Sequence, residues 1–159
     1  MTLRVHPDEI VTESTSPLVA CHESWERIRL GEVFEIKNGA AFKSKDFNPE
    51  GDGIPLIRIR DVGQSQSDTW YSGEYKNDYL VSSGEILIGM DGDFRVAKWS
   101  GPLSVLNQRV CRLTPLDPDH YEKNFLLHLL QGYLDEVHKV TSAVTVKHLS
   151  SKTVGDLPV

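Results

Sequence analysis

Hydrophobic and polar positions alternate over short runs through most of the chain. In the segment GDGIPLIRIRDV, Ile57 and Ile59 would point to one side of a strand while Arg58 and Arg60 point to the other. This pattern predicts a half-exposed strand, followed by a polar loop over residues 63–70.

Similar short apolar runs predict further strands. The segment from Ile28 to Ile36 indicates a strand or a short helix that ends at Asn38-Gly39. After a turn at Ser83-Gly84, we expect a strand over 85–90, another after residues 91–93, and a fourth within 103–113. Short strands at this spacing predict an antiparallel or mixed sheet and not alternating βαβ units.

One amphipathic helix is predicted near the C-terminus. Asp117 is suited to cap it and Pro118 to occupy its first position. Its apolar residues repeat with helical spacing and should pack against the sheet: Leu126, Leu129, Leu130, Tyr133, Leu134 and Val137. Beyond His138 we expect extended chain and then a short helical turn in LSSKTV. The predicted fold class is α+β, mainly antiparallel or mixed β-sheet with one packed helix.

The length of 159 residues fits a single domain. Residues 1–24 are polar and without a sustained period, so we expect a loosely packed leader with one short helix, ahead of a domain over 25–159. No apolar run approaches the roughly 18 residues of a spanning helix, and no secretory signal is visible, which favours a cytoplasmic protein without a membrane role. Cys21 and Cys111 form no metal-binding or disulfide pattern, so no structural metal is expected.

The charge distribution narrows the possible partners. A net charge of −6 argues against a protein that coats nucleic acid without sequence preference. Residues 1–24 carry −3 of this charge, and two later stretches, 93–112 and 139–152, are locally positive. Such stretches can be either a binding surface or a solvated face, and charge alone leaves both interpretations open.

Motifs for catalysis are missing from the sequence. No glycine-rich cofactor turn follows a strand, and no GxSxG, HExxH or GxxxxGK motif occurs. The segment DPDHYEK, residues 117–123, has the residue types of a Mg²⁺ site, but acidic residues at a helix start also stabilise the helix dipole. The sequence therefore favours a binding protein over an enzyme.

The segment ILIGMDGDFRVAKW, residues 86–99, combines a hairpin signal with charge. Asp-Gly at a strand end indicates a tight turn. Arg95 and Lys98 follow beside Phe94 and Trp99, whose rings could anchor the cations. Arginine can pair with a guanine edge and aspartate can accept from a cytosine amine, so the segment is either a plain hairpin or a DNA-contacting loop.

The order of several motifs carries a family resemblance. WERIRLGEV, GIPLIRIRDV, SSGEILIGMDGDFRVAKW, LNQRVCRL and VTVKHLSSKTVGDLPV, within residues 25–159, together resemble a target recognition domain of a type I restriction-modification specificity subunit. The resemblance implies a non-catalytic reader of duplex DNA, in which two such domains joined by helical spacers each read half of a split site. It also implies adenine methyltransferase and motor-nuclease subunits as partners, which would bind S-adenosylmethionine, ATP and Mg²⁺, with no cofactor on this chain.

This chain departs from the family pattern, because it contains one recognition domain and no spacer helix. We therefore expect either a fragment or one half of an assembly, and Met1 favours the amino-terminal domain of the pair. Two other hypotheses stay open. One is an interaction or inhibitory module that docks on the methyltransferase without reading DNA, and the other is a module excised from a single-chain nuclease-methyltransferase.

The predicted DNA contacts combine the charged loops with the exposed side of the first strand. Lysines and a threonine on either side of the hairpin are interpreted as phosphate contacts, with a solvated surface as the alternative. The full predicted set is Lys43, Lys45, Arg58, Arg60, Asp91, Asp93, Arg95, Lys98, Thr145 and Lys147.

Overall fold

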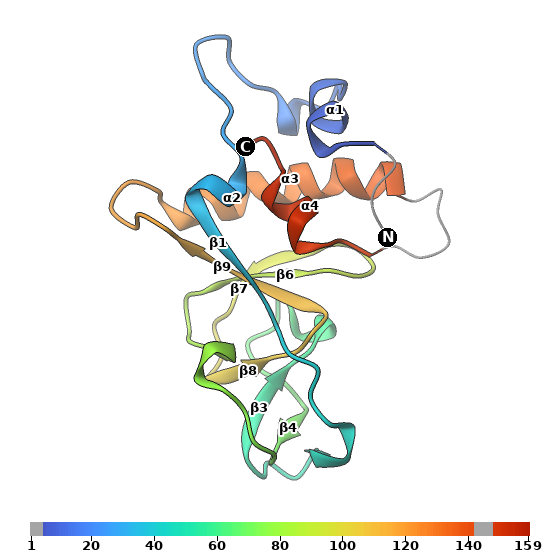
Figure 1. Ribbon diagram of the computed structural model, residues 1–159, viewed down its shortest axis with the longest axis vertical. Helices are drawn as coiled ribbons and strands as arrows, with labels where there is room; N and C mark the ends of the chain where they lie inside the picture. Colours follow the sequence, from blue (N-terminus) through green and yellow to red (C-terminus); the bar gives the residue numbers. More distant parts are fainter. Residues whose placement is uncertain (1–4, 142–147) are drawn as a thin grey trace.

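A helical layer and two β-sheets are stacked along the long axis of the molecule (Figure 1). The computed structural model describes residues 5–141 and 148–159. In the view of Figure 1 the helices lie at the top, a four-stranded sheet crosses the middle, and a five-stranded sheet forms the lower end. The predicted α+β class with antiparallel and mixed sheets is confirmed.

The four-stranded sheet is antiparallel throughout, in the order β1-β9-β6-β7. Its strands are β1 (Phe34–Asn38), β6 (Ile86–Gly89), β7 (Val96–Lys98) and β9 (Val110–Pro115). All four residues of β6 are buried. Ile86 and Ile88 join the core beneath the helices, whereas Leu87 joins a second core between the two sheets. The strand is therefore covered on both faces, as its unbroken apolar run requires.

The five-stranded sheet has the order β2-β4-β3-β8-β5 and is mixed, because β3 and β8 run parallel. Its strands are short: β2 (Phe47–Asn48), β3 (Ile54–Ile57), β4 (Trp70–Tyr71), β5 (Leu80–Val81) and β8 (Ser104–Leu106). Within the described residues, 3₁₀ turns accompany the sheets and the leader: η1 (Pro17–Val19), η2 (Ser44–Asp46), η3 (Ile59–Asp61) and η4 (Asn77–Tyr79).

Two strand predictions are wrong, because the chain leaves the strand within each predicted run. The predicted half-exposed strand is the fully buried β3, and the chain leaves it at Arg58 to form η3. The buried carboxylate of Asp61 accepts the Arg58 N–H at 2.8 Å, which removes that N–H from any strand ladder. The run over 103–113 is divided between β8 and β9, which belong to different sheets.

At the start of the domain, the segment 28–36 contains both predicted alternatives, the helix α2 (Leu30–Val33) followed by β1.

The predicted amphipathic helix is α3 (Lys123–Thr141), and its apolar stripe is buried as expected except for Leu129, which is partly buried. It begins five residues after Pro118, so the predicted start is wrong. Asp117 instead accepts the Asp119 N–H at 3.2 Å, and its carbonyl closes a separate turn with Tyr121. The helix also continues past His138 to Thr141, and the rest of the stretch predicted to be extended, residues 142–147, lies outside the described residues. The predicted short turn in LSSKTV is confirmed as α4 (Ser151–Gly155), capped by the Ser150 hydroxyl.

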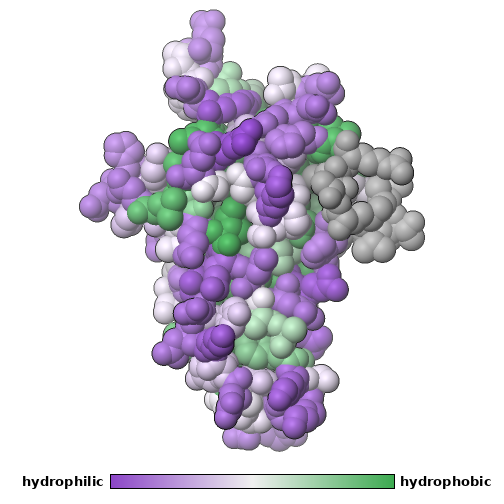
Figure 2. Space-filling view, viewed as in Figure 1, coloured by the Kyte–Doolittle hydropathy of each residue, from purple (hydrophilic) through white to green (hydrophobic). Residues whose placement is uncertain are grey.

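Hydrophilic residues cover most of the face shown in Figure 2, over the helical layer and both sheets. No described helix combines the length and the apolar character needed to cross a membrane. Cys111 is buried in the four-stranded sheet, and Cys21 is exposed. Burial raises the pKa of the Cys111 thiol to about 12.

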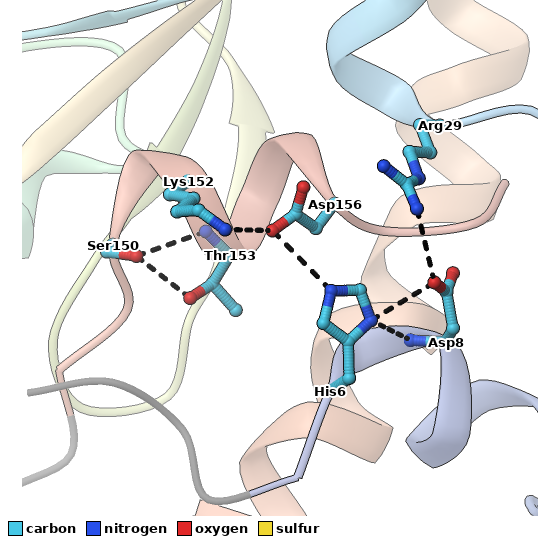
Figure 3. Close-up of polar contacts among 7 residues, drawn as sticks. All are labelled: His6, Asp8, Arg29, Ser150, Lys152, Thr153 and Asp156. Atoms are coloured by element: carbon cyan, nitrogen blue, oxygen red, sulfur yellow. Dashed lines mark hydrogen bonds and ion pairs between the residues drawn. The ribbon is translucent and has the colours of Figure 1, made fainter.

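The described part of the leader, residues 5–24, packs against the rest of the chain, which corrects the expectation of a loosely packed segment. In α1 (Pro7–Thr12), Ile10 and Val11 are buried in the core that includes α3. The ring of His6 lies between two carboxylates, 3.1 Å from Asp8 and 3.8 Å from Asp156 beyond α4 (Figure 3). Two adjacent apolar residues, Ile10 and Val11, show no helical period in this polar segment, so the sequence did not predict their burial. The boundary at residue 24 stays a prediction.

We expect Leu87→Ala to lower the free energy of unfolding by about 2–5 kcal/mol, because it leaves a cavity between the sheets. Leu103, whose exposed fraction is 51% compared with 1% for Leu87, provides a matched control. Leu103→Ala should change stability by no more than about 0.5 kcal/mol. Urea unfolding measures both, and equal effects would contradict the two-sided burial of β6.

The two cysteines should react at very different rates. The raised pKa of the Cys111 thiol keeps it protonated, and burial shields it from reagents. We therefore expect iodoacetamide at pH 8 to modify Cys21 in the native protein and Cys111 only after unfolding. Mass spectrometry of the alkylated protein reports each site. Rapid native modification of Cys111 would show that this part of the sheet is open.

Candidate functional site

A hollow of about 450 Å³ lies between η3 and the connection from β6 to β7. Val62 and Gly89 are its buried members, and a Cβ on Gly89 would lie only 3.1 Å from the Ile59 side chain. Glycine at position 89 therefore lets η3 approach β6 closely. The charged members, half-buried or exposed, are Arg60, Asp91, Asp93 and Arg95.

The connection between β6 and β7 is shaped by backbone conformations that few residues adopt. The Gly89 N–H donates to the Arg95 carbonyl at 2.9 Å and closes the base of the loop. Gly92 has a φ of 72°, so the predicted Asp-Gly turn is present. Phe94 also has a positive φ of 49°, which costs a non-glycine residue about 1–2 kcal/mol. The strain is local to the part of the loop that lines the hollow.

Burial of the Phe94 ring compensates for this strain. The ring is fully buried and meets the ring of His138 on α3 edge-on, with 5.4 Å between the centroids. The side chains on either side of it, Asp93 and Arg95, are exposed. Phe94 thus fixes the loop to the core and turns its charged neighbours outward.

This arrangement corrects the expected role of the two aromatic rings. Trp99 is buried like Phe94, and its indole N–H donates to the Pro102 carbonyl at 2.8 Å. Among the described residues, neither ring makes a cation–π contact with Arg95 or Lys98. The rings hold the backbone and do not anchor the cations.

Arg60 is held through its guanidinium, while more than half of its side chain stays in solvent. Its guanidinium donates to the Thr69 hydroxyl at 3.0 Å and lies 3.7 Å from the Asp61 carboxylate. The side chain is nevertheless 56% exposed. Such a partly fixed arginine presents donors to a ligand at a lower entropic cost than a free one.

Four of the other predicted contacts lie outside the hollow. Arg58 is half-buried next to η3, and Lys98 donates to the side-chain oxygen of Asn124 on α3 at 3.1 Å. Lys43 and Lys45 are exposed around η2, next to the edge strand β2. The other two predicted contacts, Thr145 and Lys147, fall outside the described residues.

Sequence reasoning missed two residues that contact Asp91. The Asp91 carboxylate lies 2.6 Å from His148 Nδ1 and 3.1 Å from an Arg109 terminal nitrogen. Arg109 belonged to a basic stretch but was interpreted as part of a strand, and His148 was one of six scattered histidines. Only the pairing of three distant segments brings these side chains together.

The charged groups of the site suit a polar ligand with both donors and acceptors. Arg60 and Arg95 offer donors around the hollow, while Asp93 is an exposed acceptor. The basic stretch 93–112 does not form one patch, because Arg112 is largely buried and bonded to the Leu80 carbonyl. Within residues 5–141 and 148–159, no three metal-ligating side chains converge as they would around an ion.

Comparisons with known proteins agree on one family. The family of type I restriction modification DNA specificity domains matches residues 22–159. The chain is 45% identical, over 148 residues, to the type I restriction enzyme EcoBI specificity subunit of Escherichia coli. That match covers 93% of this chain and 31% of the relative, so the chain spans about a third of its length. A putative type I specificity subunit of Mycoplasma pneumoniae is 21% identical over 143 residues, covering 87% of this chain and 34% of that protein.

Solved structures share the fold at lower identity. The HsdS subunit from Thermoanaerobacter tengcongensis superimposes with a TM-score of 0.62 at 22% identity, over 96% of this chain and 36% of that one. The S subunit of a type I restriction-modification system from M. genitalium gives a TM-score of 0.57 at 14% identity, over 89% and 36% of the two chains.

Gly92 tests whether the turn depends on its backbone conformation. A Cβ at Gly92 would meet no atom within 4 Å, so a substitution there is disfavoured by the positive φ alone. We expect Gly92→Ala to lower the free energy of unfolding by about 1–2 kcal/mol and Gly92→Asn to lower it less, because asparagine tolerates this conformation. Urea unfolding compares the variants. Equal stability of Gly92→Ala and the wild type would show that the turn relaxes freely.

Proposed function

The chain belongs to the family of type I restriction-modification DNA specificity domains, and on that premise we propose that it recognises one half of a bipartite duplex DNA target without catalysing a reaction. Methylation and cleavage would be carried out by other subunits. The function of this chain would be to select the sequence on which they act.

The hollow with its charged loop is the observation that best supports this proposal. Arg60 and Arg95 supply donors, and Asp93 supplies an exposed acceptor within the same hollow. Base edges in the major groove present mixed patterns of donors and acceptors, which such side chains can distinguish. The net charge of −6 opposes uniform binding to phosphates, so affinity would depend on this local surface.

The partners follow from the same proposal. Because the chain spans about a third of its curated relative, the rest of a specificity subunit would supply helical spacers and a second recognition domain. Adenine methyltransferase subunits would dock on that subunit and bind S-adenosylmethionine. A motor-nuclease subunit would bind ATP and Mg²⁺, and the complex would act on DNA in the cytoplasm.

Arg95→Ala tests base recognition in the methyltransferase complex that contains this chain. If Arg95 contacts a base edge, its removal should cost about 1–3 kcal/mol of discrimination at one base pair, with the fold unchanged. The measurement is the methylation rate on duplexes that each differ from the target at a single base pair. Arg29→Ala, in the helical layer, controls for the loss of an exposed arginine.

Two results would each contradict one part of the proposal, the role of Arg95 in the first case and the absence of catalysis by this chain in the second. One is an unchanged base preference for a well-folded Arg95→Ala variant, which would remove Arg95 from the reading surface. The other is methylation of any duplex by the purified chain with S-adenosylmethionine alone, which would show that the chain is itself an enzyme.

A further inference from the structure

Three segments that are far apart in the sequence meet where β6 ends. The Met90 N–H donates to the Arg109 carbonyl at 2.9 Å, and the Met90 carbonyl accepts the Leu149 N–H at 2.7 Å. Asp91 and His148 then face each other as an antiparallel bridge. These backbone bonds hold the side chains of Asp91, Arg109 and His148 on one rigid support.

The Asp91 carboxylate is engaged on both oxygens. Oδ1 lies 2.6 Å from His148 Nδ1, and Oδ2 lies 3.1 Å from an Arg109 terminal nitrogen, Nη1. That nitrogen is 3.4 Å from His148 Nδ1, and the carboxylate is the acceptor that both groups share. With an arginine beside it, Asp91 is better suited to hold Arg109 than to accept a hydrogen bond from a cytosine amine.

Arg109 is only partly used by these contacts. Its side chain is 51% exposed, and Asp91 and His148 meet the guanidinium at Nη1. Among the described residues, no acceptor contacts Nε or the other terminal nitrogen, Nη2. These two groups form one edge of the planar guanidinium, and their parallel N–H bonds match two neighbouring acceptor atoms.

We propose that Arg109 contacts DNA through this edge and that Asp91 is the positioning residue for Arg109, not a base contact itself. The inference rests on the proposed function and adds a residue to the binding surface beyond those predicted from the sequence. Duplex DNA offers suitable pairs of acceptors in two places, the O6 and N7 atoms of guanine and the oxygens of a phosphate. These two sources have different experimental signatures.

The experiment uses the complete specificity subunit, assembled with its methyltransferase subunits. The variants are Arg109→Ala, Arg109→Lys and Asp91→Asn. A second arginine–aspartate pair, Arg29 and Asp8, lies 3.8 Å apart in the helical layer and provides matched controls, Arg29→Ala and Asp8→Asn (Figure 3). Fluorescence anisotropy measures binding to duplexes with single base-pair changes over a series of salt concentrations, and circular dichroism verifies folding.

Contact with guanine predicts that Arg109→Ala loses about 5- to 150-fold of discrimination at one G·C pair. Replacing that guanine with 7-deazaguanine should then weaken binding of the wild type but not of Arg109→Ala, and Arg109→Lys should not restore the preference. Contact with phosphate predicts instead that Arg109→Ala weakens binding to all duplexes equally. The salt slope then falls by about one unit, and Arg109→Lys restores most of the affinity.

Asp91→Asn should reproduce the pattern of Arg109→Ala to a smaller extent, because the guanidinium loses its charged support but keeps its donors. A folded Arg109→Ala variant with wild-type affinity and preference would overturn the inference. So would an Asp91→Asn variant that changes preference at a different base pair, because Asp91 would then read DNA by itself. If the wild-type complex discriminates between duplexes and the Arg109→Ala complex has the same affinity and base preference, only this inference fails. If the wild-type complex itself shows no base preference, the proposed function is overturned too.

Discussion

Burial of β6 on both faces is the constraint on which the rest of the molecule depends. Ile86 and Ile88 pack beneath the helices, and Leu87 packs between the two sheets, so the strand has no solvated side. A strand buried in this way needs a layer above it and a layer below it, which accounts for the three-layer arrangement. Where β6 emerges from this packing, the next residues are Asp91 and the charged loop. The candidate site is therefore the exposed end of a strand that is buried on both faces.

The position of the site at the end of the buried strand β6 explains why it combines a rigid support with polar side chains. The loop is fixed by the buried Phe94 ring, and its base is closed by the bond between Gly89 and Arg95. Asp91 is further held by the bridge to His148. A recognition surface benefits from such support, because side chains that are already positioned lose less entropy on binding. The backbone strain at Phe94 is local to the same loop and is compensated by burial of its ring.

Local patterns in the sequence were sufficient for the elements that depend on local physics. The apolar run of β6, the Asp-Gly turn and the stripe of α3 all follow from residue spacing, and each was predicted correctly. The strand predicted through Ile59 failed because the buried Asp61 carboxylate takes the Arg58 N–H, a contact that alternation does not reveal. The side-chain direction of Phe94 depends on its positive φ, so the sequence suggested a ring that anchors cations where the structure has a ring buried in the core. Arg109 and His148 meet Asp91 only through the pairing of distant segments, and no short motif contains that information.

The order of the strands also affects how the chain folds during its synthesis. β1 pairs along its whole length with β9, but residues 39–109 lie between them and include both other strands of the four-stranded sheet and all of the five-stranded one. A ribosome must therefore complete this intervening segment before β1 gains its partner. Pairing over so long a separation is slow, since loop closure costs entropy before any contact forms. We expect the nascent chain to pass through a stage in which β1 is an unpaired edge, and the antiparallel pair of β6 and β7, whose residues are close in sequence, to be the first part of that sheet to form.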